Sequence, residues 1–378
     1  MLKELGTIHT GSTPKTNDES LFGGDYPFVT PGDLDSSKPI EFTSRTLTEA
    51  GLKTSDLLPK DSILVCCIGS LGKIGIAGRP LVTNQQINAV VFDQKQVDPR
   101  YGLLACRRLK SQLETMAPAT TVPIVNKSRF SELKIPVPPL SEQRRIAAIL
   151  DQAETLRTQR RTALALLDTL TQSIFLDMFG DPVTNPMKWK QLRIEEIGKV
   201  ITGNTPSRAN SSFYGNDVEW IKSDNINTPN YYLTKSSEGL SLAGKAVART
   251  VPALSILVTC IAGSPDCIGN AAMTDREVSF NQQINALVTK NADPHFVYAQ
   301  MMVGKRLIQQ ASTKGMKGMV SKSRFEQIVF IAPPLPLQQT FATRIQAIEA
   351  LKSTHRIALA QLDALFASLQ HRAFSGTL

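Results

Sequence analysis

The chain of 378 residues contains nearly the same strings twice, in the same order and about half its length apart. The clearest example is NQQINAV at residues 84–90, which returns as NQQINAL at residues 281–287. TGSTP and TGNTP, SILVCCIG and SILVTCIA, and paired copies of KSRF and PPL recur at shifts of 192 to 197 residues. Solenoid repeats have periods of only roughly 20 to 50 residues. The sequence therefore predicts one long module that has been duplicated.

Each copy contains the same succession of predicted elements. SILVCCI and INAVVF, like their counterparts SILVTCI and INALVT, are short, apolar and rich in β-branched residues, which is typical of strands. A helix is expected to start at Asp98 and another at Asp293, because an acidic residue followed by Pro favours a helix N-terminus. Up to its PPL motif, each copy is predicted to be a mixed α/β domain.

A long helix is predicted after each PPL motif. No Gly or Pro occurs from Ser141 to Met178, and apolar residues alternate at spacings of three and four, interrupted once at Arg160. The second copy keeps this register, with His355 in the place of Arg160. At about 1.5 Å per residue each helix is expected to be roughly 55 Å long, and it needs a packing partner in water. We therefore expect the two apolar seams to form an antiparallel coiled coil.

The predicted fold class is α+β, with two tandem α/β domains related by a pseudo-two-fold axis and joined by the two long helices. The predicted α/β domains are residues 1–140 and 182–336, and the predicted spacer helices are residues 141–181 and 337–378. The string KWKQL, which leads into the second copy, has no counterpart before Leu2. The first domain is therefore expected to lack a small edge element.

Composition narrows the class of partner and compartment. The formal charge of +9 favours an acidic partner such as nucleic acid. No apolar run approaches the roughly 18 residues of a membrane span, and the N-terminus lacks the regions of a signal peptide, so a cytoplasmic location is expected. The five cysteines form no C-x-x-C pair, which argues against a zinc ribbon or a disulfide framework. No metal site is predicted.

The two α/β modules each end in a proline-rich segment, IPVPPLSEQRRIAAIL or IAPPLPLQQTFATRI, which leads into a long helix. This organisation resembles the specificity (S) subunit of type I restriction-modification enzymes over nearly the whole chain. The resemblance implies that each module is a target recognition domain that reads one half of a bipartite site on double-stranded DNA. It implies that the helices set the half-site spacing and dock methyltransferase (modification) subunits, with restriction subunits in the full complex. S-adenosylmethionine and ATP are then expected on partner subunits, and no cofactor in this chain.

An enzyme and an interaction scaffold are the two other classes of function to compare with the sequence. The phosphate-loop pattern G-x-x-x-x-G-K-[ST] is absent, no G-x-G-x-x-G follows a strand, and the Asn/Asp-Pro-Pro-aromatic signature of adenine methyltransferases does not occur. The chain is therefore predicted to be a non-catalytic recognition subunit, with no catalytic residues. The alternative is a coiled-coil interaction scaffold that does not bind DNA. Salt-dependent DNA binding separates these two readings.

Base readout is expected where the two copies differ, because modules that read different sequences should differ where they touch bases. The candidate base-reading residues are Lys15, Asn17 and Asp33 in the first module, and Arg208, Asn210, Lys222, Asp224 and Asn225 in the second. Each of them is also compatible with an ordinary exposed loop residue. The candidate phosphate contacts are Lys127, Arg129, Lys322 and Arg324 in the KSRF motifs, and Lys314 and Lys317 in a glycine-rich loop. Solvated surface charge is the alternative for all six.

What the copies share is expected to build the module. Gln and Asn side chains can pair with adenine, which makes the NQQ segments possible DNA contacts. A structural role is nevertheless favoured for Gln85, Gln86, Gln282 and Gln283, namely local capping at the entry to a strand. Gly11 and Gly203 of the TGSTP and TGNTP strings are expected to permit a tight turn, with backbone contact to phosphate as the alternative.

Overall fold

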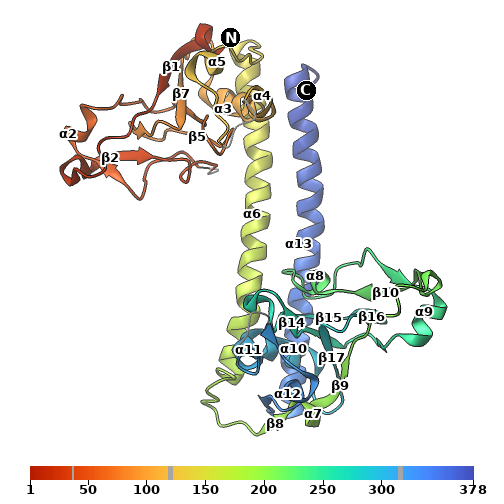
Figure 1. Ribbon diagram of the computed structural model, residues 1–378. Helices are drawn as coiled ribbons and strands as arrows, with labels where there is room; N and C mark the ends of the chain where they lie inside the picture. The colour runs from red at the N-terminus through yellow and green to blue at the C-terminus, as the bar shows by residue number, and fades with distance from the viewer. Residues whose placement is uncertain (36–37, 118–121, 314–317) are drawn as a thin grey trace. The chain divides into compact units, whose positions relative to one another are not determined.

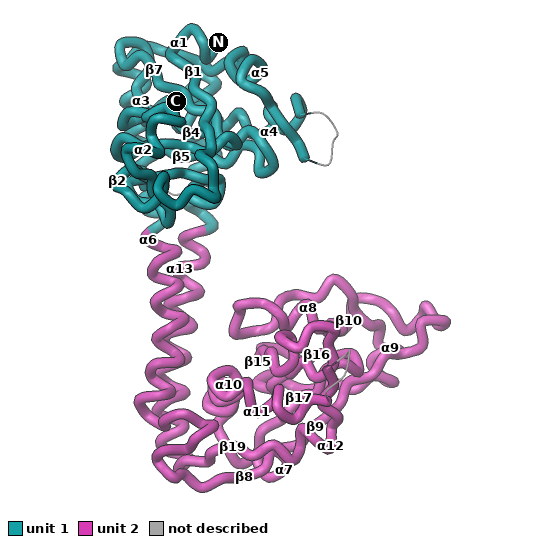
Figure 2. Tube along the Cα trace, turned by 60° about the vertical axis from the view of Figure 1, so that its left-hand side comes forward, with its two compact units in different colours: residues 1–158, 360–378 teal, residues 159–359 magenta. Residues whose placement is uncertain are grey.

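The computed structural model describes residues 1–35, 38–117, 122–313 and 318–378 (Figure 1). It divides into two compact units (Figure 2). Unit 1 comprises Met1–Thr158 and Ala360–Leu378, and unit 2 comprises Gln159–Leu359. Each unit thus holds one copy of the module and a part of both long helices, so the helices do not form units of their own.

Unit 1 is built on two sheets. The main sheet is antiparallel in the order β1–β7–β4–β5, with β1 (Gly6–Thr10), β4 (Ile63–Cys66), β5 (Ile74–Ile76) and β7 (Ile87–Phe92). The small sheet has the order β3–β2–β6, with β2 (Phe22–Val29), β3 (Thr46–Leu47) and β6 (Val82–Thr83). Its helices are α1 (Leu2–Leu5), η1 (Glu19–Leu21), α2 (Glu49–Leu52), α3 (Pro99–Arg107), α4 (Lys110–Met116), α5 (Lys127–Ser131) and the first part of α6 (Leu140–Phe179).

Unit 2 repeats this arrangement. Its main sheet has the order β15–β13–β17–β9, with β9 (Gly198–Thr202), β13 (Ile256–Thr259), β15 (Ala271–Met273) and β17 (Ile284–Thr289). Its small sheet has the order β11–β10–β16–β12, with β10 (Tyr214–Ile221), β11 (Gly239–Leu240), β12 (Thr250–Val251) and β16 (Val278–Phe280). Its helices are α7 (Ile194–Ile197), η2 (Ser211–Phe213), α8 (Ser223–Ile226), α9 (Leu242–Val247), η3 (Pro265–Cys267), α10 (Pro294–Val303), α11 (Lys305–Gln310), α12 (Lys322–Glu326) and the first part of α13 (Leu335–Ser375).

Two further short strand pairs lie in unit 2, and the second of them corresponds to the isolated antiparallel bridge between Ile68 and Ile124 in unit 1. They are β8 (Gln191–Arg193) with β19 (Val329–Ile331), and β14 (Ile261–Ala262) with β18 (Gly318–Met319). Strand β8 includes Gln191 and Leu192 of the KWKQL string. The adjoining backbone contact is kept in both copies, since Leu2 N donates to Leu133 O at 2.8 Å and Ile194 N donates to Ile328 O at 3.0 Å.

The continuous apolar runs of the central strands follow from burial on both faces. In unit 1, Ile63 and Val65 of β4 belong to one hydrophobic cluster and Leu64 belongs to another. In unit 2, Ile256 and Leu257 of β13 are divided between two clusters in the same way. Such strands have no polar face and therefore show no alternating pattern.

The predicted helix starts at Asp98 and Asp293 are confirmed, because each carboxylate accepts two backbone N–H groups of the first helical turn. The predicted single helix is divided in both copies, into α3 and α4 and into α10 and α11. In the second copy the division falls at Gly304, which caps the end of α10.

Both long helices are continuous and antiparallel, as predicted. In unit 2, Lys352 Nζ lies 2.9 Å from Asp168 Oδ1, and Arg160 Nη1 lies 3.1 Å from His355 Nδ1. In the same direction, residue numbers therefore increase along α6 and decrease along α13, which makes the two helices antiparallel in unit 2. The two residues that interrupt the apolar seams, Arg160 and His355, face each other. The predicted α+β class, with two α/β modules and two long helices, is confirmed.

Each module is tied to its long helix by a buried glutamine. Gln143 Oε1 accepts from Asp98 N at 2.9 Å, and Gln338 Oε1 accepts from Asp293 N at 3.0 Å. The Nε2 atoms donate to carbonyl oxygens of the PPL segments, at 2.8 Å in unit 1 and 2.7 Å in unit 2. These shared contacts hold the module to its long helix in the same way in both units.

In the described part of the chain, no helix combines the length and the apolar character that a membrane span requires.

Candidate nucleic-acid interface

The shared strings TGSTP/TGNTP and NQQ meet in both units. Thr13 Oγ1 donates to Gln85 Oε1 in unit 1, and Thr205 Oγ1 donates to Gln282 Oε1 in unit 2. All four side chains are exposed. Each module therefore presents the same hydroxyl–amide pair to solvent. The structural role favoured for Gln85 and Gln282 stays a prediction, with DNA contact as its alternative.

The asparagine of each NQQ segment builds the turn that enters β7 or β17. Asn84 and Asn281 are buried, and the Oδ1 atom of each accepts the backbone N–H two residues later at 3.1 Å. Their Nδ2 atoms donate to Oε1 of Gln86 at 2.9 Å and of Gln283 at 3.1 Å. The structural role predicted for Gln86 and Gln283 is confirmed, since both complete this local capping.

Gly11 and Gly203 are needed for a different reason from the one predicted. Neither lies in a turn and neither has a positive φ, so the prediction of a tight turn was wrong. A Cβ on Gly11 would lie 2.2 Å from the Asn84 carbonyl oxygen, and a Cβ on Gly203 would lie 2.2 Å from the Asn281 carbonyl oxygen. Glycine is required because the end of one strand approaches the NQQ turn closely.

Three candidate base readers, Asp33, Asn210 and Asn225, cap local turns with their side-chain oxygens. Thr30 N donates to Asp33 Oδ2 at 2.8 Å, and Lys222 N donates to Asn225 Oδ1 at 3.1 Å. Asn210 Oδ1 accepts from Ser212 N at 3.1 Å, and Asp18 plays the same part in unit 1. Asp and Asn are equivalent as caps, so these positions differ in sequence but have the same local role.

An arginine lies over an aromatic pair on the small sheet of each unit. The Arg45 guanidinium carbon is 4.6 Å from the ring centre of Phe22 and 5.7 Å from that of Phe28. In unit 2 the aromatic pair is Tyr214 and Trp220, and the guanidinium carbon of Arg208 lies 4.6 and 4.9 Å from their centres. Cation–π stacking fixes the plane of each guanidinium.

The arginine of the second copy has a carboxylate beside it. Arg208 Nη2 donates to Glu238 Oε2 at 2.8 Å, and Lys222 Nζ donates to Glu238 Oε1. Lys222 and, next, Arg208 hold the pKa of Glu238 below its ordinary value. By the spacing of 193 between β3 and β11, Glu238 stands where the first copy has Arg45. The candidates Arg208 and Lys222 are thus brought together, and the cluster has a net charge of +1.

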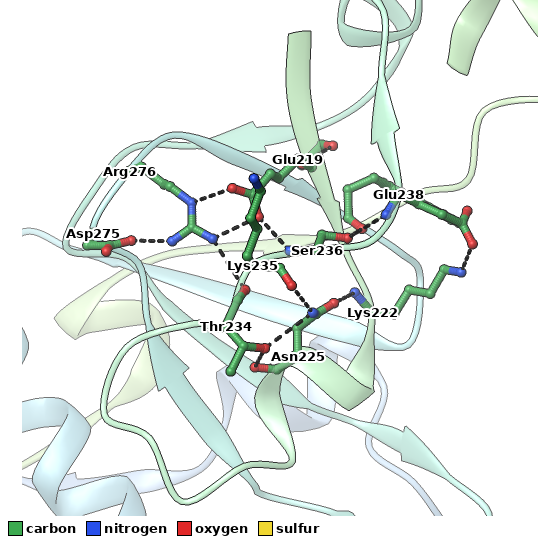
Figure 3. A network of polar contacts seen from close by, with 11 residues as sticks. Glu219, Lys222, Asn225, Thr234, Lys235, Ser236, Glu238, Asp275 and Arg276 are labelled. Atoms are coloured by element: carbon green, nitrogen blue, oxygen red, sulfur yellow. Dashed lines mark hydrogen bonds and ion pairs between the residues drawn. The ribbon is translucent and has the colours of Figure 1, made fainter. Parts of the chain in front are cut away.

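In unit 2 a network of hydrogen bonds and ion pairs holds the loop that carries Thr234 and Ser236 (Figure 3). The Arg276 guanidinium donates to both carboxylate oxygens of Glu219 at 2.8 Å, and Glu219 Oε2 also accepts from Ser236 N at 2.7 Å. Arg276 lowers the pKa of Glu219, and the carboxylates of Glu219 and Asp275 raise the pKa of Arg276. This network holds the strand β10 to the segment that carries Thr234 and Ser236.

The KSRF motifs anchor α5 and α12. Their phenylalanines, Phe130 and Phe325, are fully buried. Arg129 Nη1 donates to Met116 O at 3.0 Å, and Arg324 Nη1 donates to Ala311 O at 3.4 Å, so both arginines cap the preceding helix. Lys322 lies 3.5 Å from Glu326.

Four candidates remain exposed, and their side chains make no hydrogen bond or ion pair to the residues that the structure describes: Lys15, Asn17, Asp224 and Lys127. Lys314 and Lys317 lie outside the described residues. The assignment of every candidate to base or phosphate contact stays a prediction. Arg45 and Glu238 were missed, although their opposite charges at aligned positions were visible in the sequence.

No group of three or more His, Cys, Asp or Glu side chains within the described ranges is placed to hold a metal ion. Burial raises the pKa of Cys67, Cys106 and Cys260 to about 12, so these thiols stay protonated at neutral pH. The exposed stacked arginines and lysines are suited to anionic groups and to the acceptor edges of bases.

Two copies of one α/β module, each tied to a pair of antiparallel long helices, define a class of duplicated proteins with long spacer helices. The model of the type I restriction modification DNA specificity domain matches residues 1–165 and 186–362. The chain therefore belongs to this family of specificity subunits.

Several known proteins are similar to this chain. The MjaIX specificity subunit of Methanocaldococcus jannaschii is 29% identical over 55% of this chain and 53% of its own length. The HindI specificity subunit of Haemophilus influenzae is 29% identical over 43% of this chain and 36% of its own length. In both, the match covers less than two thirds of the relative. The S subunit structure from M. genitalium has the same fold, with a TM-score of 0.63 and 14% identity over 99% of this chain and 94% of that one.

Proposed function

We propose that this chain is the DNA-reading subunit of a type I restriction-modification complex and that each module recognises one half of a split site. The observation that carries this proposal is duplication with divergence. The glycine, the NQQ turn and the buried glutamine are the same in both modules, whereas the exposed arginine over the aromatic pair comes from a different position in each. The chain itself is non-catalytic in this proposal.

Arg45 and Arg208 are the strongest candidates for base readout. Stacking fixes the plane of each guanidinium, whose N–H groups suit the two acceptors of guanine in the major groove. In Arg208 one of these groups, Nη2, also donates to Glu238. Lys15, Asn17, Asp224 and the Arg208 partner Lys222 are further candidates for base contact. The capping residues Asp33, Asn210 and Asn225 are proposed to shape the loops instead.

Phosphate contacts are assigned to exposed lysines. Lys127 and Lys322 occupy the same position at the start of α5 and α12. Equivalent contacts from two modules would set the register of both on the duplex without carrying sequence information. Arg129 and Arg324 contribute charge near these lysines while their guanidinium groups cap the preceding helices.

The long helices are proposed to dock methyltransferase (modification) subunits. Each unit exposes one equivalent pair of seam leucines, which suits two copies of one partner. In unit 1 these are Leu156 and Leu365, 44% and 50% exposed, and in unit 2 they are Leu351 and Leu170, 47% and 42% exposed. S-adenosylmethionine then belongs to the methyltransferase subunits and ATP to the restriction subunits of the full complex. Such an assembly on double-stranded DNA places the chain in the cytoplasm.

The half-site spacing is proposed to follow from helix length. Helices of 40 and 41 residues are about 60 Å long at 1.5 Å per residue. That length is compatible with half-sites between one and one and a half turns of DNA apart, at about 34 to 36 Å per turn. Matched insertion of one heptad in both helices should lengthen the spacer, and unchanged spacing would discard this part of the proposal.

The test is selection of bound duplexes from a random pool, with and without the cognate methyltransferase subunit, followed by sequencing. We expect a split motif with a fixed non-specific gap. Arg45→Ala should relax one half-site and Arg208→Ala the other, while each leaves the remaining half unchanged. No enrichment, even with the partner present, would contradict DNA reading and favour the coiled-coil scaffold.

A further inference from the structure

A cavity of about 390 Å³ lies in unit 2, where α6, α10 and α13 meet the segment that carries Tyr231. Its apolar walls include Tyr231, Tyr298, Met302 and Val303. Burial raises the pKa of both tyrosines, so their rings stay neutral. The cavity is therefore lined on one side by aromatic and aliphatic surface.

The opposite wall is a satisfied ion cluster of the two long helices. Lys352 is 5% exposed and Glu349 is 8% exposed. Lys352 Nζ lies 2.7 Å from Glu349 Oε1 and 2.9 Å from Asp168 Oδ1. Arg356 Nη1 also lies 3.9 Å from Glu349 Oε2, so two cations face the two carboxylates and the cavity has no need of an ionic ligand.

One polar atom on this wall has no partner. Thr171 Oγ1 is buried and makes no hydrogen bond to the described residues. Thr171 also lines the cavity. A buried hydroxyl without a partner is unfavourable, so a ligand that offers a hydrogen-bonding group here would gain affinity.

Unit 1 contains the same ion cluster, but an aromatic ring covers it. Arg157 pairs with Glu154 and with Asp363, the latter at 2.6 Å. The Arg157 guanidinium carbon lies 4.4 Å from the ring centre of Phe366. The chain thus provides its own phenyl ring in this unit.

The two clusters correspond residue by residue at the repeat spacing of 195. The counterparts of Arg157, Glu154, Asp363 and Phe366 are Lys352, Glu349, Asp168 and Thr171. The ring that covers the cluster in unit 1 is therefore replaced by a small hydroxyl side chain in unit 2, where the cavity lies.

We propose that the cavity in unit 2 binds a single phenol-type aromatic ring, which packs between the tyrosine wall and Lys352 while its hydroxyl pairs with Thr171. The site lies on the helix junction and is independent of the proposed reading of DNA. The same ring chemistry is offered by a small phenolic molecule and by a tyrosine side chain of a partner subunit.

The test uses 4-fluorophenol as the probe and follows its fluorine NMR line with the full-length chain. We expect saturable binding at one site. Thr171→Phe, which supplies the ring found in unit 1, should weaken binding by about tenfold or more, whereas Thr169→Phe on the exposed face of the same helix should not. Met302→Trp fills the cavity from α10, a different helix, and should have the same effect as Thr171→Phe.

Absence of binding to the wild-type chain would overturn the proposal. Equal binding by the wild type and by folded Thr171→Phe and Met302→Trp variants would overturn it as well. Displacement of 4-fluorophenol by the methyltransferase subunit would identify the natural ring as a partner side chain. Simultaneous binding of both would identify it as a small molecule.

Discussion

The small sheets of the two modules reach the same arrangement by different routes. In unit 1, Arg45 comes from the segment before β3, and no carboxylate of the described residues pairs with it. In unit 2, Arg208 comes from the loop after β9, and Glu238 occupies the position of Arg45. The comparison teaches that the frame specifies where a guanidinium lies, while the loops decide which residue supplies it and which charges surround it.

The modules also differ in how they meet their long helix. In unit 1, Arg100 donates to Asp151 with Nε at 3.0 Å, which is a charged contact. In unit 2 the counterparts are His295 and Gln346, and His295 Nδ1 lies 2.6 Å from the Tyr231 hydroxyl. The junction is therefore ionic in one copy and neutral in the other, although the buried glutamine contact is the same.

The largest expected effect tests the shared frame. Gly203→Ala should lower the free energy of unfolding of unit 2 by about 3 kcal/mol, because the added Cβ would meet two carbonyl oxygens. Gly11→Ala should act equally on unit 1. Hydrogen exchange, read unit by unit, measures both. The control is Gly263→Ala, because a Cβ at this position would have open space around it. An equally large loss of unfolding free energy in this variant would contradict the role of close backbone contact at Gly11 and Gly203.

A second prediction concerns the ring that only unit 1 possesses. Phe366→Thr should lower the free energy of unfolding of unit 1 by about 2 kcal/mol, below the usual cost for a fully buried ring because Phe366 is half-buried. Thr171→Phe should leave unit 2 as stable or make it more stable. Urea denaturation of both variants checks this, and a stable Phe366→Thr variant would show that the ring does not stabilise the cluster.

A smaller effect separates capping from DNA reading. Asn210→Ala and Asp18→Ala should each lower the free energy of unfolding by about 1 kcal/mol through loss of the cap. Neither should change the selected DNA sequence. If Asn210→Ala changes one half-site while the stability is kept, the residue reads a base and the equivalence of the two caps fails.

The smallest expected effect is a pH dependence confined to unit 2. Burial lowers the pKa of His295 from its ordinary value of 6.5. The unfolded chain therefore takes up a proton before the folded chain does, and stability present above pH 6.5 is lost as the pH falls towards the folded pKa. His295→Gln should abolish this dependence in a thermal denaturation series, because glutamine does not titrate. The effect is confined to unit 2 because unit 1 has Arg100 at the equivalent position. If the stability of His295→Gln depends on pH as steeply as that of the wild type, another group causes the dependence.

Much of the frame was predictable because it depends on local patterns. The repeat, the apolar strands and the Asp-Pro helix starts are all visible along the chain. The apolar seams of the long helices, together with the path of the chain between the modules, predicted their antiparallel pairing. Arg45 was missed because its importance arises only when the segment before β3 folds over Phe22 and Phe28. Asp33 and Asn225 looked different in sequence although both side chains make the same cap. Sequence comparison detects a change of letter, whereas capping depends only on the shared side-chain oxygen.

The central claim is that each module carries its own specificity on a common frame. It is tested most directly by a chain in which residues 1–140 are replaced by a second copy of residues 182–336, assembled with the methyltransferase subunit and used to select duplexes from a random pool. We predict a split site whose two half-sites are identical and equal to the wild-type half read by the second module. A site that keeps two different half-sites would contradict the account.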